Sequence, residues 1–163
     1  MAAWRQMTVG DIDGLLRVAD EVHPDLPEGG HIFTERVKLF PEGCLVLVEN
    51  NEICGYAISH PIRQRQPPAL DSLLSEIEPD ANQYYFHDLA ILPKLRGKGY
   101  AAECINRLLE VAKRYPTSCL VSVYGTSPFW ARFGFKPEPV DQVLKERLKN
   151  YGDNATYLSR LNG

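Results

Sequence analysis

A short basic segment with two glycines, Arg96, Gly97, Lys98 and Gly99, lies where an apolar run has ended and an amphipathic helix is about to begin. The first backbone N–H groups of a helix have no partner within the helix and carry the positive end of its dipole, so they can bind a phosphate. Glycine lets the phosphate come close, and the two cations add charge that a structural turn does not need. The segment therefore predicts an anion site, and a plain helix start with solvated basic residues is the structural alternative.

Two nucleotide-binding motifs compete for this segment. A P-loop needs G-x-x-x-x-G-K followed by Ser or Thr, and that pattern is absent. Residues 97–102, GKGYAA, satisfy the loose dinucleotide pattern G-x-G-x-x-A. That fold requires an acidic residue about twenty positions on, and the segment SVYG at 122–125 offers none. A dinucleotide oxidoreductase is the rival interpretation.

The segments around the glycine loop predict a strand, a helix and a second strand in that order. Residues 84–92 form a β-rich run, and from 99 to 115 the apolar residues form one helical stripe. Residues 119–124 form the next β-rich run, so the helix connects two strands that should be parallel.

The remaining segments predict mostly antiparallel strands with helices between them. Asn50 and Asn51, which tolerate the positive φ of a tight turn, should join two strands into a hairpin. Between 61 and 82 lies a polar, proline-containing excursion with one helical candidate at 70–77. The fold class is α/β, with a mixed, mostly antiparallel central sheet, one parallel crossover and helices on both faces. The other expected elements are strands at 4–7, 44–49, 52–60 and 155–161 and helices at 8–19, 34–39, 127–133 and 140–150.

Composition limits the class of protein. With 163 residues and 44% hydrophobic content, the chain fits one domain spanning 1–163. The net charge of −3 is small and the basic residues are scattered, which argues against nucleic acid as a partner. The sequence contains neither a signal peptide nor an apolar run of about eighteen residues, so we expect a soluble cytoplasmic protein without a membrane partner. Four cysteines lie singly in apolar runs, as buried thiols do.

Residues 89–112, LAILPKLRGKGYAAECINRLLEVA, resemble the coenzyme A site of the GNAT superfamily of N-acetyltransferases. The superfamily pattern is Arg or Gln, two residues, Gly, one residue, then Gly or Ala, and Arg96, Gly99 and Ala101 match it. Residues 128–135, PFWARFGF, resemble the second signature of the family, which is an aromatic pair followed by Gly134 and Phe135. The likeness extends from residue 4 to residue 135.

The resemblance implies acetyl-CoA as co-substrate and no metal. Backbone amides from Gly97 to Ala101 should hold the pyrophosphate of coenzyme A, and the backbone of residues 89–91 should pair with its pantetheine arm where two strands separate. The residues expected to contact the coenzyme are Leu89, Ala90, Ile91, Arg96, Gly97, Lys98, Gly99, Tyr100, Ala101 and Trp130.

Acetylation of an amine requires a base, because the ammonium must lose a proton. His87 lies on the strand that leads to the coenzyme site, and imidazole titrates near neutral pH. Melatonin-pathway members of the superfamily carry histidines at the strand positions that hold Tyr85 and His87 here, so the match is partial. Period-two alternation places Tyr85 and His87 on one face and Asp88 on the other, barring a bulge. An ordered water is the alternative proton carrier.

The departing thiolate also needs a proton. The family often places a tyrosine as general acid at the second member of the aromatic pair, where this chain has Trp130. Either Tyr124 takes this role, or water donates the proton. The missing tyrosine keeps open a second interpretation, a GNAT-like module that holds acetyl-CoA without turnover.

The acceptor is left open by the sequence. A small-molecule amine and a peptide amine both fit the resemblance, as do a monomer and a homodimer. Asp71, Glu76, Glu78 and Asp80 in the excursion would favour a cationic amine, although a solvated polar loop explains them equally well.

Overall fold

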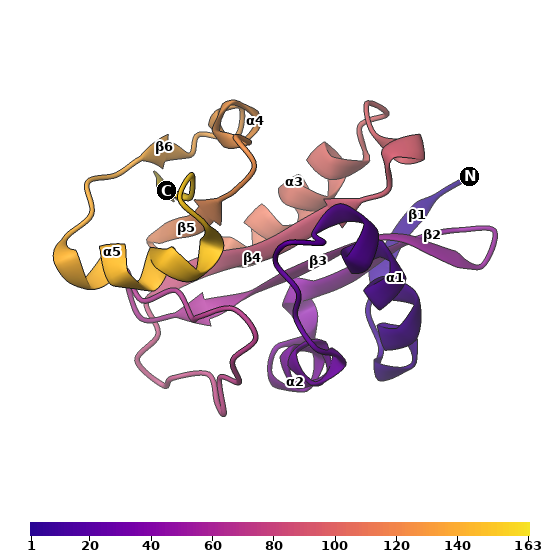
Figure 1. Ribbon diagram of the computed structural model, residues 1–163, viewed down its shortest axis with the longest axis horizontal. Coiled ribbons are helices and arrows are strands. Elements are labelled where there is room, and N and C mark those ends of the chain that lie inside the picture. The colour runs from indigo at the N-terminus through magenta and orange to yellow at the C-terminus, as the bar shows by residue number, and fades with distance from the viewer.

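A seven-stranded sheet forms the centre of the computed structural model, which describes residues 1–163 (Figure 1). The strand order is β1-β2-β3-β4-β5-β7-β6. The strands are β1 (Ala3–Gln6), β2 (Cys44–Glu49), β3 (Glu52–Ile62), β4 (Gln83–Ile91), β5 (Thr117–Ser122), β6 (Lys136–Pro137) and β7 (Thr156–Leu161). The helices are α1 (Ile12–Val22), α2 (Gly30–Leu39), α3 (Tyr100–Ala112), α4 (Ser127–Ala131) and α5 (Gln142–Leu148).

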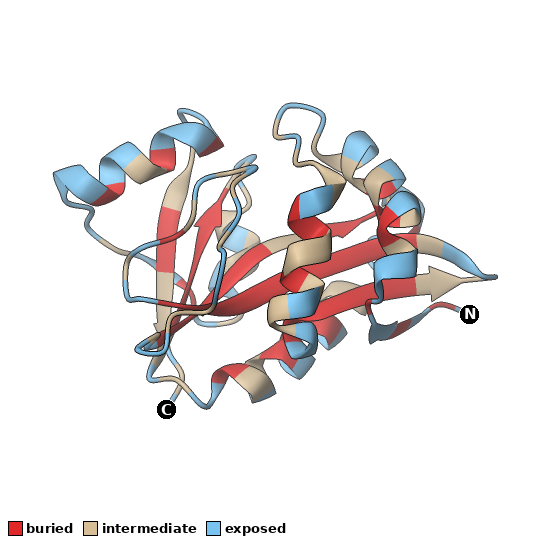
Figure 2. Cartoon of the chain, turned by 90° about the horizontal axis from the view of Figure 1, so that it is seen from below, coloured by how far each residue is buried: buried red, intermediate tan, exposed pale blue.

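The sheet is mixed, as the sequence predicted. All neighbouring strands are antiparallel except β4 and β5, which α3 connects as a parallel crossover. The apolar stripe of α3 packs on one face of the sheet, where Cys104 and Leu108 are buried beside Phe86. Helices α1 and α2 cover the other face with Leu15 and Phe33 (Figure 2). The four cysteines are free and buried, which confirms the expectation of buried thiols.

Most predicted elements are confirmed within a few residues. The β2–β3 hairpin turns at Asn50 and Asn51, whose φ angles are 53° and 66°. Helix α2 begins at Gly30, four residues before its predicted start, because Gly29 adopts an extended conformation and serves as the N-cap. No helix has the length and apolar character required to cross a membrane.

The predicted helix at 70–77 is wrong. The segment 63–82, here called the strap, contains no helix, and Asp71 and Ser75 in it have positive φ angles of 55° and 70°. The backbone amides of Leu74 and Ser75 donate to the carboxylate of Glu35 on α2, at 2.6 Å and 3.0 Å. These amides are therefore satisfied by another element, and the strap takes its shape from that contact.

Candidate active site

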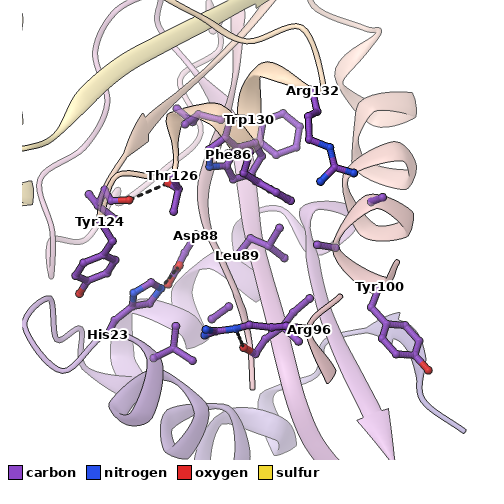
Figure 3. A pocket seen from close by; sticks show the side chains of 18 of the residues that line it. His23, Phe86, Asp88, Leu89, Arg96, Tyr100, Tyr124, Thr126, Trp130 and Arg132 are labelled. Carbon is purple, nitrogen blue, oxygen red and sulfur yellow. Dashed lines mark hydrogen bonds and ion pairs between the residues drawn. The ribbon is translucent and has the colours of Figure 1, made fainter. Parts of the chain in front are cut away.

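A cleft opens where β4 and β5 separate. The two strands pair from Gln83 and Thr117 to Phe86 and Leu120, and no pairing continues beyond these residues. The cleft has a cavity volume of about 870 Å³, within the range of about 300–1,000 Å³ that small-molecule sites occupy. Residues of β4, β5, α4, the end of α1 and the start of α3 line it (Figure 3).

One end of the cleft is formed by the glycine loop and the first turn of α3. Gly97 and Gly99 have φ angles of 76° and 88°, in the region that favours glycine, and a Cβ at either position would meet open space. Gly99 is the N-cap of α3 and no side chain caps this helix end. Arg96 donates from Nε to the carbonyl of Ile91 at 3.0 Å, which holds the loop against the end of β4. An anion therefore has free access to the first amides of α3.

Aromatic side chains form a wall in the middle of the cleft. Trp130 on α4 packs against Phe86 and Phe135, with ring centroids 6.4 Å and 5.7 Å apart. On the opposite wall, the edge of Leu89–Ile91 that faces away from β3 has no strand partner, since β5 has already separated. An extended ligand can therefore lie along β4 over an apolar surface.

A β-bulge at His87 shapes the other end of the cleft. Ser59 of β3 is opposite Phe86 and Ile58 is opposite Asp88, so His87 is an extra residue in β4. His87 lies on the face that Tyr85 occupies, since its Nδ1 is 3.3 Å from the Tyr85 hydroxyl. The alternation that places Asp88 on the opposite face was predicted for a strand without a bulge. The bulge is present, and it turns Asp88 to the same face as His87.

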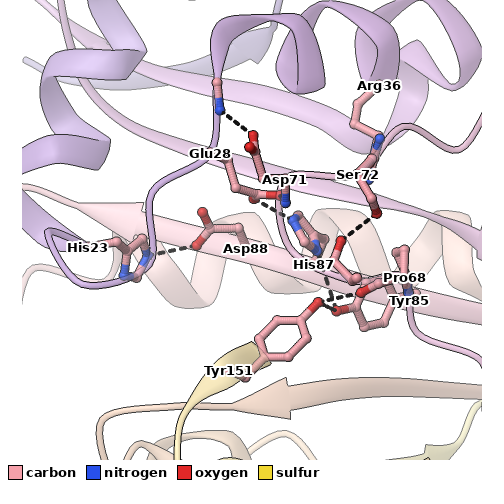
Figure 4. Close-up of polar contacts among 12 residues, drawn as sticks. His23, Glu28, Arg36, Pro68, Asp71, Ser72, Tyr85, His87, Asp88 and Tyr151 are labelled. Carbon is pink, nitrogen blue, oxygen red and sulfur yellow. Dashed lines mark hydrogen bonds and ion pairs between the residues drawn. The ribbon is translucent and has the colours of Figure 1, made fainter. Parts of the chain in front are cut away.

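His87 is fully engaged by protein groups. Its Nε2 contacts Glu28 Oε1 at 2.6 Å, and its Nδ1 contacts the hydroxyl of Tyr85, which also contacts Tyr151 at 3.0 Å (Figure 4). Counted over the whole residue, His87 is 9% exposed, and it lines the cleft. Tyr85 is completely buried and does not line the cleft. With both ring nitrogens bonded, His87 is arranged to position its neighbours rather than to accept a proton from a substrate.

A second histidine, His23 at the C-terminal end of α1, lines the same end of the cleft as His87. Its Nε2 donates to Asp88 Oδ1 at 2.8 Å, and the other carboxylate oxygen accepts from the Tyr56 hydroxyl at 2.5 Å. The second ring nitrogen of His23, Nδ1, has no hydrogen-bond partner in the protein. Nδ1 is also buried, so it is unpaired rather than exposed to the cleft. A histidine held by a carboxylate at one nitrogen and unpaired at the other has the hydrogen-bonding arrangement of a general base.

Neighbouring charges shift the pKa values of both His23 and Asp88. Burial lowers the pKa of His23, but the hydrogen bond to Asp88 and the charges of Asp88 and Glu28 outweigh burial and the opposing charge of Arg96, so the pKa lies above 6.5. Burial would raise the pKa of Asp88, yet its contacts with His23 hold that pKa below its ordinary value. The pair therefore favours a charged carboxylate and a basic imidazole.

Tyr124 stacks on His23 at the rim of the cleft. The two ring centroids are 5.6 Å apart and the planes are 9° from parallel. Tyr124 is 50% exposed and has a φ of 56°, an uncommon conformation for a residue other than glycine that often marks a functional site. Partial burial and the charges of Asp25 and Asp88 raise the pKa of its hydroxyl, which keeps it protonated at neutral pH.

Beyond His23 the cleft adjoins a small cavity, here called the inner chamber, of about 30 Å³. Its lining combines the two histidine–carboxylate pairs with four aliphatic side chains and one tyrosine. These residues are His23, Leu26, Glu28, Leu70, His87, Asp88, Val121, Val123 and Tyr151.

A family profile described as "Acetyltransferase (GNAT) family" matches residues 13–135, which is most of the chain. The chain belongs to the GNAT acetyltransferase family. No curated protein sequence matches it.

Solved GNAT structures share the whole fold. The loading GNATL domain of CurA from Lyngbya majuscula superposes with a TM-score of 0.81 at 13% identity, covering 99% of this chain and 98% of that one. The GNAT-like decarboxylase GphF, solved with isobutyryl-CoA, has a TM-score of 0.77 at 16% identity, covering 99% and 100%. The ribosomal-protein-S18-alanine N-acetyltransferase from Escherichia coli has a TM-score of 0.68 at 12% identity, covering 100% and 95%. At these identities the likeness concerns the fold.

The residues that the sequence assigned to the coenzyme lie together in this GNAT chain. All of them line the cleft except Lys98, which is exposed beside it. Of the three residues assigned to catalysis, His87 and Tyr124 line the cleft and Tyr85 does not. Sequence reasoning missed His23, Asp88 and Glu28. His23 and Asp88 are 65 positions apart, and only the bulge brings them together. No local sequence pattern therefore predicts their contact.

The buried pair of Glu28 and His87 leads to a prediction about stability. The side chains are 4% and 1% exposed. Burial raises the pKa of Glu28, but His87 and the Asp71 amide lower it by more than burial raises it. The pKa of Glu28 therefore lies below 4.5. A carboxyl with a depressed folded pKa stabilises the protein above its unfolded pKa, and this contribution is lost as pH falls through the folded pKa.

We expect Glu28→Gln to lower the free energy of unfolding at neutral pH by about 1–3 kcal/mol, since the amide keeps the shape and loses the charge. The difference from the wild type should shrink as pH falls below 4.5. Urea unfolding at about pH 7 and about pH 3 measures both values. Glu103→Gln, on the exposed side of α3, is the control. An equal difference at both pH values would contradict the proposed charge.

Proposed function

We propose that this GNAT chain is an acetyl-CoA-dependent N-acetyltransferase that acts on a primary amine. The cleft fits the co-substrate in three parts. The amides at the start of α3 would hold the pyrophosphate, with Arg96 and Lys98 adding charge, and the free edge of Leu89–Ile91 would pair with the pantetheine arm. Trp130 would support that arm from α4.

The observation that carries the proposal is the His23–Asp88 pair beside the separated strands. Asp88 holds Nε2–H of His23, so Nδ1 keeps its lone pair. Nδ1 is buried in the free protein, so a bound acceptor would have to displace the side chains that cover it before the ammonium gives its proton to this nitrogen. Acetyl-CoA supplies a thioester carbonyl for the resulting amine to attack. Tyr124, stacked on His23, can give its hydroxyl proton to the departing thiolate. Glu28 and His87 bond to each other beside this pair and form part of the wall of the inner chamber.

A test of the proposal follows free thiol while the protein is incubated with acetyl-CoA and a panel of primary amines. Thiol release that depends on the amine, with an acetylated amine found by mass spectrometry, supports the transferase. The replacement of the family tyrosine by Trp130 favours a second candidate, a module that binds acetyl-CoA without turnover. Tight binding of acetyl-CoA by calorimetry without amine-dependent thiol release would establish the binding module instead.

The role of Tyr124 can be tested by Tyr124→Phe. The substitution keeps the ring that stacks on His23 and removes the hydroxyl proton. We expect turnover to fall about tenfold or more. The melting temperature should change little, because the side chain is half exposed and its hydroxyl forms no hydrogen bond within the protein. Full turnover in Tyr124→Phe would assign the proton donor to water.

A further inference from the structure

The strap closes the inner chamber on the side of α1 and α2. The amide of Asp71 donates to Glu28 Oε2 at 2.8 Å, and the carboxylate of Asp71 accepts from the amide of Gly29 at 2.8 Å (Figure 4). Glu28 thus binds the strap with one oxygen and His87 of β4 with the other. The strap and the chamber wall are therefore joined through a single carboxylate.

The strap is also fastened to the C-terminal part of the chain. The hydroxyl of Tyr151 donates to the carbonyl of Pro68 at 2.7 Å, and Arg147 donates to the carbonyl of Pro67 at 3.2 Å. Arg65 donates to the carbonyl of Pro139 at 2.7 Å. The strap therefore spans from the segment after α1 to the segment around α5. An extended peptide could enter the chamber from this side only by displacing it.

The chamber offers no free cation to a ligand. Glu28 and Asp88 line it, each paired with a histidine, and neither lysine nor arginine is among the lining residues. The nearby Arg36 is turned away, bonded to Glu35 and to the carbonyl of Ser72. A substrate carboxylate in this chamber would meet two carboxylates whose imidazole partners are already engaged, and no lysine or arginine, which is unfavourable at low solvent exposure. An ammonium would be attracted.

None of the acids of the strap lines the chamber. Glu78 and Asp80 pair with Arg63 on the exposed side, and Asp71 bonds to the backbone of Gly29. The sequence alternative of a solvated loop is therefore correct for Glu78 and Asp80, and the carboxylates that line the chamber are Glu28 and Asp88.

The size and walls of the chamber limit what accompanies the amine. A volume of about 30 Å³ holds about two or three heavy atoms, since one water requires about 10–15 Å³ by this measure. Leu26, Leu70, Val121 and Val123 make about half of the wall apolar. The polar half consists of groups that are already bonded to other protein groups, so a polar substituent would lose its hydrogen bonds to water without gaining free partners.

Resting on the proposed acetyltransferase function, we propose that the acceptor is a small primary amine with a short apolar substituent and no carboxylate. Amino acids are disfavoured because no lysine or arginine lines the chamber to pair with their carboxylate. Peptide N-termini are disfavoured because the chamber holds only about two or three heavy atoms. The amine nitrogen lies at His23 and its substituent enters the inner chamber.

The experiment compares matched acceptors with the wild-type protein and acetyl-CoA. Isopropylamine and alanine differ by a methyl group in place of a carboxylate, and a trialanine amide represents a peptide N-terminus. We expect kcat/KM for isopropylamine to exceed that for alanine and for the peptide by at least about tenfold. Equal or better use of alanine or the peptide overturns the acceptor class and leaves the acetyltransferase in place. Acetyl-CoA binding without acetylation of any amine overturns the acetyltransferase, and the acceptor class with it.

A charge added to the chamber wall provides a second test. Leu70→Arg places a cation on the strap where it lines the chamber, and Leu73→Arg adds the same charge at a position that is 55% exposed and outside it. In Leu70→Arg the kcat/KM ratio of alanine to isopropylamine should rise at least about tenfold, whereas Leu73→Arg should leave it unchanged. An unchanged ratio in folded Leu70→Arg overturns the charge argument. If Leu70→Arg does not fold, the wild-type comparison decides.

Discussion

Gly99→Glu should abolish coenzyme A binding, with an affinity loss of at least about 100-fold, or about 2.7 kcal/mol. Gly99 is the N-cap of α3, and its Cβ position faces open space at the end of the cleft. A carboxylate there would occupy the site that the helix dipole and the first amides provide for a phosphate, and would repel that phosphate. Isothermal titration calorimetry with coenzyme A measures the effect.

Gly99→Ala separates charge from backbone strain. Any side chain at a φ of 88° is strained, and the strain costs about 1–3 kcal/mol of stability. Alanine carries the same strain without the carboxylate, so it should keep most of the affinity while lowering the melting temperature as the glutamate does. Unchanged affinity in folded Gly99→Glu would show that the coenzyme binds elsewhere.

The glycine loop could be predicted because its determinants are local. Arg96, Gly99 and Ala101 lie within six positions, and the strand before them and the amphipathic helix after them set the position of the loop. The hairpin turn at Asn50 and Asn51 is local in the same sense, since both residues tolerate the positive φ that the turn requires.

The end of the cleft that contains His23 and Asp88 could not be predicted, because it depends on contacts between distant segments of the chain. One extra residue in β4 turns Asp88 toward His23, and period-two alternation without that bulge gives the opposite face. The strap illustrates the same limit. Its apolar spacing at 70–77 suggested a helix, but the carboxylate of Glu35 takes up two of its amides and holds it in another shape. A long-range acceptor for a backbone amide leaves no signal in the local sequence.

The assignment of the base to His23 rather than His87 predicts different results for the two histidines. His23→Gln should lower turnover by about 10²–10⁴-fold with little change in acetyl-CoA affinity, because, of the two histidines that line the cleft, only His23 has a ring nitrogen without a hydrogen-bond partner. In His87→Gln most of the loss should be in stability, since this side chain joins Glu28 to Tyr85 inside the protein. His31→Gln is the control, because His31 is exposed and lines neither cavity.

The pH profile tests the same assignment through Asp88. A base must be neutral to accept a proton, so kcat/KM should rise with pH through the pKa of His23, which Asp88 and Glu28 hold above 6.5. Asp88→Asn removes the nearest of these negative charges and leaves Glu28 and Arg96 as the other charges that act on the ring, with Tyr124 stacked on it. The acidic limb of the profile should therefore move to lower pH. Turnover should also fall, since an amide orients the imidazole less well. An acidic limb that stays in place in Asp88→Asn, or that survives in His23→Gln, would remove His23 from the role of base and leave water to carry the proton.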